Sequence, residues 1–321
     1  MSVPSLVGGI VLKAPDLPGA IVFAAAYGLL IPGLIHRVVA AKSRSIMIIQ
    51  VLIFTLERPT LFSLRASVAA RPDTEWNGLT KYMQATFALG YLALGQTVLR
   101  IIRTMLVNAT LGTPAADSEN KSSAPRDDQP QRRYWIRRWM EFLMVLQLLA
   151  LVIGIVATAN MYPASETGQN RSHQVLRYIS AALGLLFILF LTFSLLWAWR
   201  ALPRVSAQAV RFVLILTNLL TIPPIYRLVV MHHTTPDIHA PGHQALNTTG
   251  DKAAFYVVHL LPELIVVALL CVVNVKDVCQ TDFMGDVRYW DETPEEKEKR
   301  ERKERDKALK AAKKKGLEEQ A

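Results

Sequence analysis

Residues 256–270 read YVVHLLPELIVVALL, and this stretch decides the fold. All of its residues except His259, Pro262 and Glu263 are apolar. The apolar run around it is long enough to cross about 30 Å of hydrocarbon. An imidazole and a carboxylate four residues apart lie on one face of a helix. A membrane helix with this sequence would therefore direct His259 and Glu263 together into the interior of a bundle.

Long apolar blocks recur along the whole chain. Of its 321 residues 51% are hydrophobic, although 36 are Lys or Arg. Blocks of about 17–25 mainly apolar residues have the length of a transmembrane helix. We therefore predict an all-α polytopic membrane protein, a bundle of seven transmembrane helices, in the plasma membrane or an endomembrane. The predicted spans cover residues 17–39, 45–66, 81–106, 138–160, 176–199, 208–231 and 254–275.

The basic residues between these spans indicate an orientation. The first, third and fifth connections and the C-terminal tail are rich in Lys and Arg, whereas the alternate connections contain fewer. Basic loops of membrane proteins stay in the cytoplasm. We therefore predict that the N-terminus lies outside and the C-terminus lies in the cytoplasm.

This orientation divides the chain into three parts. Residues 1–16 are predicted as a short extracellular N-terminus, residues 17–277 as the seven-helix domain, and residues 278–321 as a charged cytoplasmic tail. The connection at residues 108–134 contains a run rich in Pro, Ser and Asp, which is typical of a disordered loop. The net charge of +10 comes mostly from the basic loops, and no feature indicates nucleic-acid binding.

Charged residues inside the spans are the first candidates for a site, because each costs about 2.5–3.5 kcal/mol at the centre of a bilayer. Glu57 lies roughly 18 Å above the inner start of the second span, and Glu263 roughly 14 Å below the outer start of the seventh. These depths nearly coincide in a core of about 30 Å. We therefore predict an ion pair such as Arg58–Glu263 or Glu57–His259, and Asn218 in the sixth span would extend the network.

Three roles for these residues stay open at this point. They would hold helices together, line a cavity for a ligand or substrate, or form a proton relay. Interhelical hydrogen bonds contribute on the order of 0.6 kcal/mol, which is enough to fix the register of two helices. The sequence contains no motif of a known catalytic type in a suitable setting, so we predict neither an enzyme nor a cofactor.

The connection before the seventh span contains four histidines. Imidazole is a good ligand for zinc or copper, but the spacing of these residues matches no tight metal-binding motif, and we predict no metal site. The weak candidates are His232, His233, His239 and His243. Two sequons on the predicted outer side, at Asn170 and Asn247, are candidate glycosylation sites.

Three stretches of the sequence are similar to a known family. They are YMQATFALGYLALGQTVLRII (82–102), IPPIYRLVV (222–230) and AFYVVHLLPELI (254–265). With Glu57 and Arg65 as an acidic-then-basic pair, the chain resembles the fungal seven-span lipid-translocating exporter-like family associated with resistance to aminocholesterol. It departs from that pattern at His259, where the family typically carries an acidic residue, and at Glu263, where it usually has an apolar one.

The resemblance implies a protein that handles or translocates amphipathic lipids and protects against toxic amphiphiles. Glu57, Arg58, His259 and Glu263 would then line the lipid path, with Arg227 near its outer mouth engaging an anionic headgroup. One alternative is a seven-span receptor whose cytoplasmic loops and tail bind a signalling partner. Another is a structural membrane protein without transport.

Overall fold

The computed structural model describes residues 3–71, 77–111, 128–159, 169–235, 239, 242–281, 283, 298–299, 301–302 and 305–306. Seven helical segments in these residues are long and apolar enough to cross a membrane. This finding confirms the predicted all-α architecture of seven spans.

The first six spans are single helices. Helices α3, α4 and α5 begin several residues before the predicted apolar blocks, because a helix continues past the hydrocarbon into the polar interface. Their bounds are α1 Lys13–Val39, α2 Ile46–Ala70, α3 Asn77–Ala109, α4 Pro130–Ala159, α5 Gln169–Ala201 and α6 Ala207–Val230.

The seventh span is built from three consecutive helical pieces. These are α7 (Thr249–Ala254), the π-helical turn η3 (Phe255–Leu260) and α8 (Leu261–Val272). In the wide turn, the amide of Leu261 donates to the carbonyl of Tyr256, five residues earlier. Pro262, which has no N–H to donate, follows directly after this wide turn, at the start of α8. A short helix, α9 (Val275–Val278), comes after the span.

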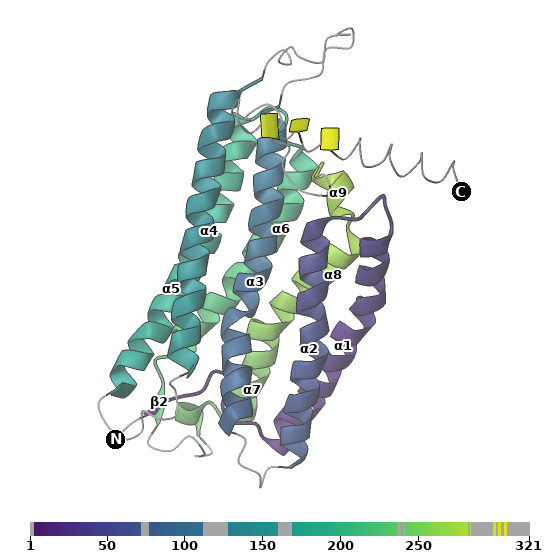
Figure 1. Cartoon of the computed structure of the whole chain (residues 1–321). Coiled ribbons are helices and arrows are strands. Elements are labelled where there is room, and N and C mark those ends of the chain that lie inside the picture. The colour runs from purple at the N-terminus through teal and green to yellow at the C-terminus, as the bar shows by residue number, and fades with distance from the viewer. Residues whose placement is uncertain are drawn as a thin grey trace.

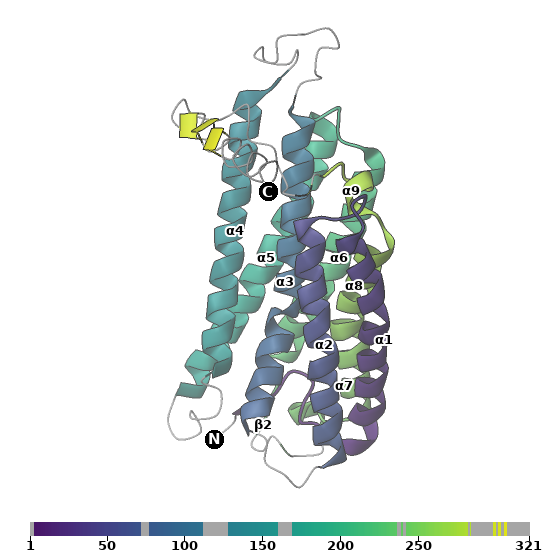
Figure 2. The same cartoon turned by 45° about the vertical axis from the view of Figure 1, so that its right-hand side comes forward.

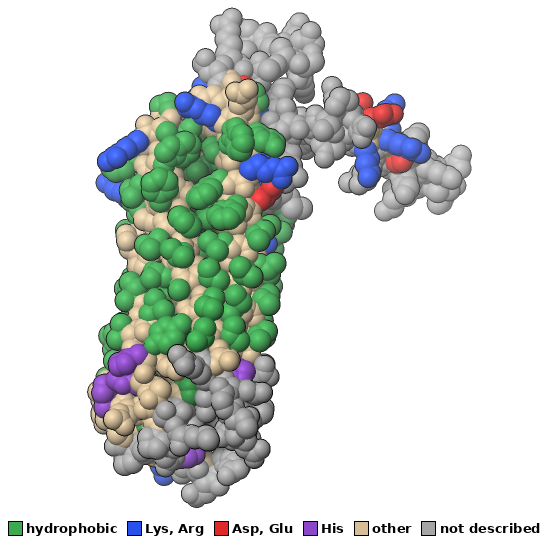
Figure 3. All heavy atoms as spheres, turned by 90° about the vertical axis from the view of Figure 1, so that its left-hand side faces the viewer, with side chains coloured by type: hydrophobic (Ala, Val, Ile, Leu, Met, Phe, Trp, Pro, Cys, Tyr) green, Lys and Arg blue, Asp and Glu red, His purple; other side chains and the backbone are tan. Residues whose placement is uncertain are grey.

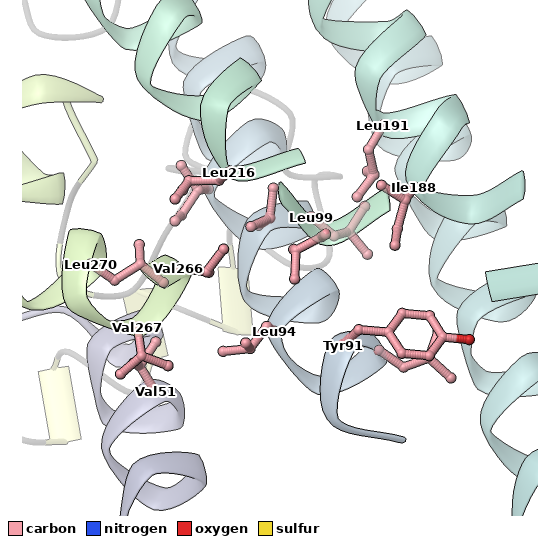
Figure 4. Close-up of a cluster of buried hydrophobic side chains, with 14 of the residues drawn as sticks. Val51, Tyr91, Leu94, Leu99, Ile188, Leu191, Leu216, Val266, Val267 and Leu270 are labelled. Atoms are coloured by element: carbon pink, nitrogen blue, oxygen red, sulfur yellow. The ribbon is translucent and has the colours of Figure 1, made fainter. Parts of the chain in front are cut away.

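The helices form an elongated bundle. Helix α1 packs against α2 and α8, helix α4 packs against α5, and α3 and α6 lie between these groups (Figures 1 and 2). The core between them is mainly apolar, with Val51, Leu94, Leu216 and Val266 fully or almost fully buried (Figure 4). Charged side chains inside this core are therefore exceptional and mark the candidate sites.

The surface of the bundle is apolar where a soluble protein would be polar. Leu29 of α1 is 82% exposed and Val229 of α6 is 61% exposed. A broad band of hydrophobic side chains covers the middle of the α4–α5 face (Figure 3). Exposed apolar surface on this scale is unsuited to water. With the seven apolar helices, it identifies an integral membrane protein.

The N-terminal residues are part of the fold. Strand β1 (Val3–Pro4) pairs antiparallel with β2 (Thr234–Thr235), and residues 4–9 are buried. The predicted extracellular N-terminus is thus packed onto one end of the bundle. The predicted loop at 108–134 is also shorter, because α3 continues to Ala109 and α4 begins at Pro130. Residues 112–127 and most of the predicted tail lie outside the described residues.

The two ends of the bundle place their cations differently. At the end where β1 and α7 lie, Arg65, Arg177, Arg227 and Lys252 are buried inside the bundle. At the opposite end of the α4–α5 face, Lys and Arg side chains are exposed (Figure 3). The separation is not complete, since Arg133 is buried at the latter end and Lys13 and Arg71 are exposed at the former, and the orientation stays a prediction.

Candidate functional site

A buried ion pair joins the second and seventh spans. Arg58 Nη2 lies 2.7 Å from Glu263 Oε2, and both side chains are inaccessible to solvent. The Arg58 guanidinium also lies 4.3 Å from the centre of the Phe54 ring, one turn earlier in α2. An aromatic face attracts a cation most strongly where water is excluded. The ion pair predicted from the equal depths of α2 and α8 residues is confirmed.

Gly90 of α3 makes room for this ion pair. A Cβ atom at this position would overlap Arg58 Nη2 and would lie 2.7 Å from both carboxylate oxygens of Glu263. Only a residue without a side chain lets α3 approach the pair so closely. Three helices, α2, α3 and α8, therefore meet at the two charges.

Gly90→Ala is expected to destabilise the protein by about 1–3 kcal/mol, the usual cost of overpacking. Gly28→Ala in α1 is the matched control, because nothing lies within 4 Å of a Cβ there. That change is expected to be neutral or to stabilise by about 0.5–1 kcal/mol, the helix preference of Ala over Gly. Thermal unfolding of the purified variants in detergent measures both effects. Equal behaviour of the two variants would contradict the tight contact.

His259 does not pair with Glu57. Its Nε2 lies 3.1 Å from the carbonyl oxygen of Phe87 in α3, and its ring is stacked on Tyr226 with centroids 5.7 Å apart. A carbonyl only accepts, so Nε2 donates the proton in this contact. Glu57 is a third exposed and accepts a hydrogen bond of 2.6 Å from the Tyr82 hydroxyl. Glu57 therefore lies at the edge of the site, whereas His259 lies inside it.

Arg227, in the last turn of α6, is buried and has a weak hydrogen-bond contact. Its Nη2 lies 4.0 Å from Met231 Sδ, a weak acceptor. Arg177 of α5 is also buried and donates to the carbonyl of Ser5 at 3.1 Å. Among the described residues, Nη1 of each arginine has no hydrogen-bond partner. Two cations thus lie in the bundle without a carboxylate in contact in the described part of the chain.

We refer to Arg58, Tyr91, Arg227, His259 and Glu263 as the core cluster. Arg227 interacts electrostatically with Tyr91 and with Glu263, so these groups form one charged region. Each member has at least one buried polar atom without a hydrogen-bond partner in the described part of the chain. Such an atom costs about 1–3 kcal/mol when left unpaired, and native proteins contain few of them. The core cluster is therefore the strongest candidate site.

The remaining predicted path residue, Asn218, is not part of the core cluster. Its side chain is exposed on α6, and its carbonyl accepts a hydrogen bond from Thr221 Oγ1 at 2.6 Å. Position 218 falls on the outward face of the helix, which the composition of the span alone did not reveal. Asn218 therefore faces away from the proposed path.

The predicted glycosylation site at Asn247 is corrected by the structure. Its side chain is buried, and Oδ1 accepts from the Ile10 amide at 3.0 Å, so it fastens the N-terminal segment and has no room for a glycan. The side chain of Asn170 lies outside the described residues.

Three of the four candidate histidines lie together. The ring centroid of His233 lies 4.1 Å from that of His232 and 4.7 Å from that of His243. His243 Nδ1 lies 2.6 Å from Asp251 Oδ1, and His239 is exposed. Burial and the two neighbouring imidazoles lower the pKa of His233. In the described ranges, no three His, Cys, Asp or Glu residues are placed to hold a metal ion.

Sequence reasoning missed a second buried charge cluster, which we call the N-terminal cluster: Asp16, Arg65, Lys252 and Tyr256. Asp16 Oδ1 lies 2.5 Å from Arg65 Nη2, and Asp16 Oδ2 lies 3.0 Å from Lys252 Nζ. The Tyr256 hydroxyl contacts Arg65 Nε and Asp16 at 3.1–3.2 Å. One signal was available, since Asp16 is the only acidic residue before Glu57.

The N-terminal cluster holds the buried N-terminal segment in place. Lys252 Nζ donates to the carbonyl of Gly8 at 2.6 Å and also to that of Ile10. Asp16 Oδ2 accepts from the Leu12 amide at 2.8 Å. Charges from α1, α2 and α7 therefore fix residues 8–12 across one end of the bundle.

No protein-family model, curated protein or solved structure matches this chain. The site is therefore interpreted from its own residues, and the resemblance to the lipid-translocating exporter-like family stays a prediction.

Proposed function

We propose that this integral membrane protein handles amphipathic lipids, and that the core cluster binds the polar headgroup of a lipid that enters the bundle. The resemblance of the third, sixth and seventh spans to the exporter-like family implies the same function. The π-helical turn η3 within the seventh span favours it as well, because such turns inside α-helices occur frequently at functional sites.

The observation that carries this proposal is that several buried polar atoms of the core cluster have no hydrogen-bond partner among the described residues. A cluster that only held helices together would use its donors and acceptors within the bundle. Here Arg58 Nη1, Glu263 Oε1 and His259 Nδ1 are buried without hydrogen-bond partners among the described residues. A lipid headgroup that carries both hydrogen-bond donors and acceptors would supply hydrogen bonds to them.

The two arginines without a contacting carboxylate support one class of headgroup. Arg177 and Arg227 interact electrostatically, and Arg177 donates to the carbonyl of Ser5, the residue after strand β1. A cationic headgroup would meet their repulsion, whereas a phosphate or sulfate would form charge-assisted hydrogen bonds with them. The ligand best suited to this region is an amphiphile with an anionic headgroup.

The test is growth of a fungal host on a panel of toxic amphiphiles with anionic headgroups. Sphingoid bases and aminosterols, whose amines are cationic, are the contrast that the two arginines should disfavour. The host produces the intact protein, the paired variant Arg58→Gln/Glu263→Gln, or the control Gly28→Ala. The paired variant removes both buried charges at once, so the protein is expected to fold. We expect protection by the intact protein and by the control, and loss of protection with the paired variant at equal protein level.

Two outcomes would contradict the proposal. Protection by the paired variant would show that the ion pair only holds helices together. Unchanged growth with every form would remove the support for lipid handling. The receptor alternative would then be tested by deleting residues 294–321, which should uncouple signalling without affecting ligand binding.

A further inference from the structure

A groove on the surface of the bundle, between α4 and α5, lies away from both charge clusters. It has a volume of about 510 Å³, and its residues come from the end of α3, the start of α4 and the end of α5. Ligand sites commonly have volumes of about 300–1,000 Å³. Residues 131, 132, 135, 136, 139 and 140 line it from α4, a spacing that follows one helix face over about 13 Å. The groove is therefore long enough for a segment of an acyl chain.

The walls of the groove are aromatic. Trp135 and Trp139 of α4 face Phe193 and Trp197 of α5 across it. The Trp139 indole donates a 2.7 Å hydrogen bond to Ser194 Oγ, which donates to the carbonyl of Phe190. The polar atoms of Trp139 and Ser194 are thus occupied by the protein itself. What the walls offer to a ligand is apolar surface, which suits an acyl chain.

One end of the groove is cationic. Arg132 and Gln131 lie in the first turn of α4, and both side chains are exposed. Arg132 Nη1 donates to Gln129 Oε1 at 3.1 Å and contacts the carbonyl of Ala201 at 3.4 Å, so the guanidinium is held at the end of α5. The start of a long helix adds positive potential. This end of the bundle carries the exposed Lys and Arg residues (Figure 3).

We infer that this groove binds an anionic phospholipid of the surrounding bilayer, with an acyl chain between the tryptophans and the phosphate at Arg132. Basic pockets between transmembrane helices on the cytoplasmic side bind anionic headgroups, and this end is the predicted cytoplasmic one. Tryptophan also favours the level of the headgroups. The inference does not depend on the proposed function, because the core cluster contributes no residue to the groove.

The test uses the tryptophans of the groove as reporters. The full chain is reconstituted in phosphatidylcholine vesicles that contain the same small fraction of either brominated phosphatidylglycerol or brominated phosphatidylcholine. Bromine quenches tryptophan fluorescence on contact. We expect the apparent affinity for the phosphatidylglycerol to be roughly fivefold higher, the factor that one arginine near an anionic lipid surface provides. Arg132→Gln should abolish that preference.

Arg138→Gln is the matched control, because it removes the same charge from α4 at a position that does not line the groove. Arg138 lies over the Tyr134 ring and pairs with Glu141 at 3.0 Å, outside the groove. This control should keep the preference for phosphatidylglycerol. The paired variant Arg58→Gln/Glu263→Gln should keep it as well, so failure of the proposed function and failure of this inference can be told apart. Equal quenching by the two lipids, equal loss in Arg132→Gln and Arg138→Gln, or stronger quenching by a brominated sterol would overturn the inference.

Discussion

Glu263→Gln is expected to destabilise the bundle by about 3–5 kcal/mol, the usual cost of removing one partner of a buried ion pair. The change removes the carboxylate at 2.7 Å from the fully buried Arg58 and leaves only Glu57, 3.9 Å from Arg58 Nε and a third exposed, to balance its charge, and a guanidinium does not lose its proton in proteins. Arg58→Gln is expected to cost less, because the remaining carboxyl group of Glu263 becomes neutral when it binds a proton. Thermal unfolding of the purified variants in detergent measures this order.

Two further variants test the cause of the asymmetry. The paired variant Arg58→Gln/Glu263→Gln is expected to recover much of the loss, since neutral replacements of a whole buried pair are often tolerated. Glu57→Gln is the control for the partly exposed neighbour: its carboxylate lies 3.9 Å from Arg58 Nε but is a third exposed, so its effect should stay within about 1 kcal/mol. If the two single changes within the pair had the same cost, the argument from the permanent charge of arginine would be wrong.

The seven spans and one ion pair could be predicted because the bilayer imposes both. A helix that crosses hydrocarbon needs a long apolar block, so block length alone located all seven spans. Arg58 and Glu263 lie at similar depths in neighbouring spans. Opposite charges inside a membrane bundle tend to pair, because pairing lowers the cost of burying them. The partner of His259 could not be predicted in this way, because it is the main-chain carbonyl of Phe87, which no side-chain pattern reveals.

The N-terminal cluster was missed for a different physical reason. The apolar count started the first span at residue 17, which left Asp16 in an extracellular segment. Arg65 lies at the end of the predicted second span and Lys252 just before the predicted seventh, and the burial of both depends on how residues 8–12 cross the bundle. That crossing is a tertiary feature without local periodicity. The π-helical turn was also unpredictable, since FYVVHL has the composition of any membrane helix.

Asp16→Asn is expected to release the N-terminal segment and to cost about 3–5 kcal/mol, because it removes the acidic partner of two buried cations. Arg65 and Lys252 would then face each other across a neutral amide. Ring contacts of the Arg65 guanidinium with Phe255, at 5.1 Å, would not compensate for a full negative charge. Hydrogen exchange at the amides of Ser5 and Ile10, which are bonded in the intact segment, measures the release.

Lys252→Met separates charge balance from the loss of any single contact. It removes one cation and its hydrogen bonds to the Gly8 and Ile10 carbonyls, but it leaves the contacts between Asp16 and Arg65 at 2.5 and 3.1 Å. The remaining pair is neutral overall, so faster exchange should be confined to residues near 8–10, with a smaller loss of stability than in Asp16→Asn. Adding Lys252→Met to Asp16→Asn should then restore part of the stability, because it removes one of the two cations left unpaired. If the double variant were less stable than Asp16→Asn alone, the hydrogen bonds of Lys252, and not the charge of Asp16, would hold the segment.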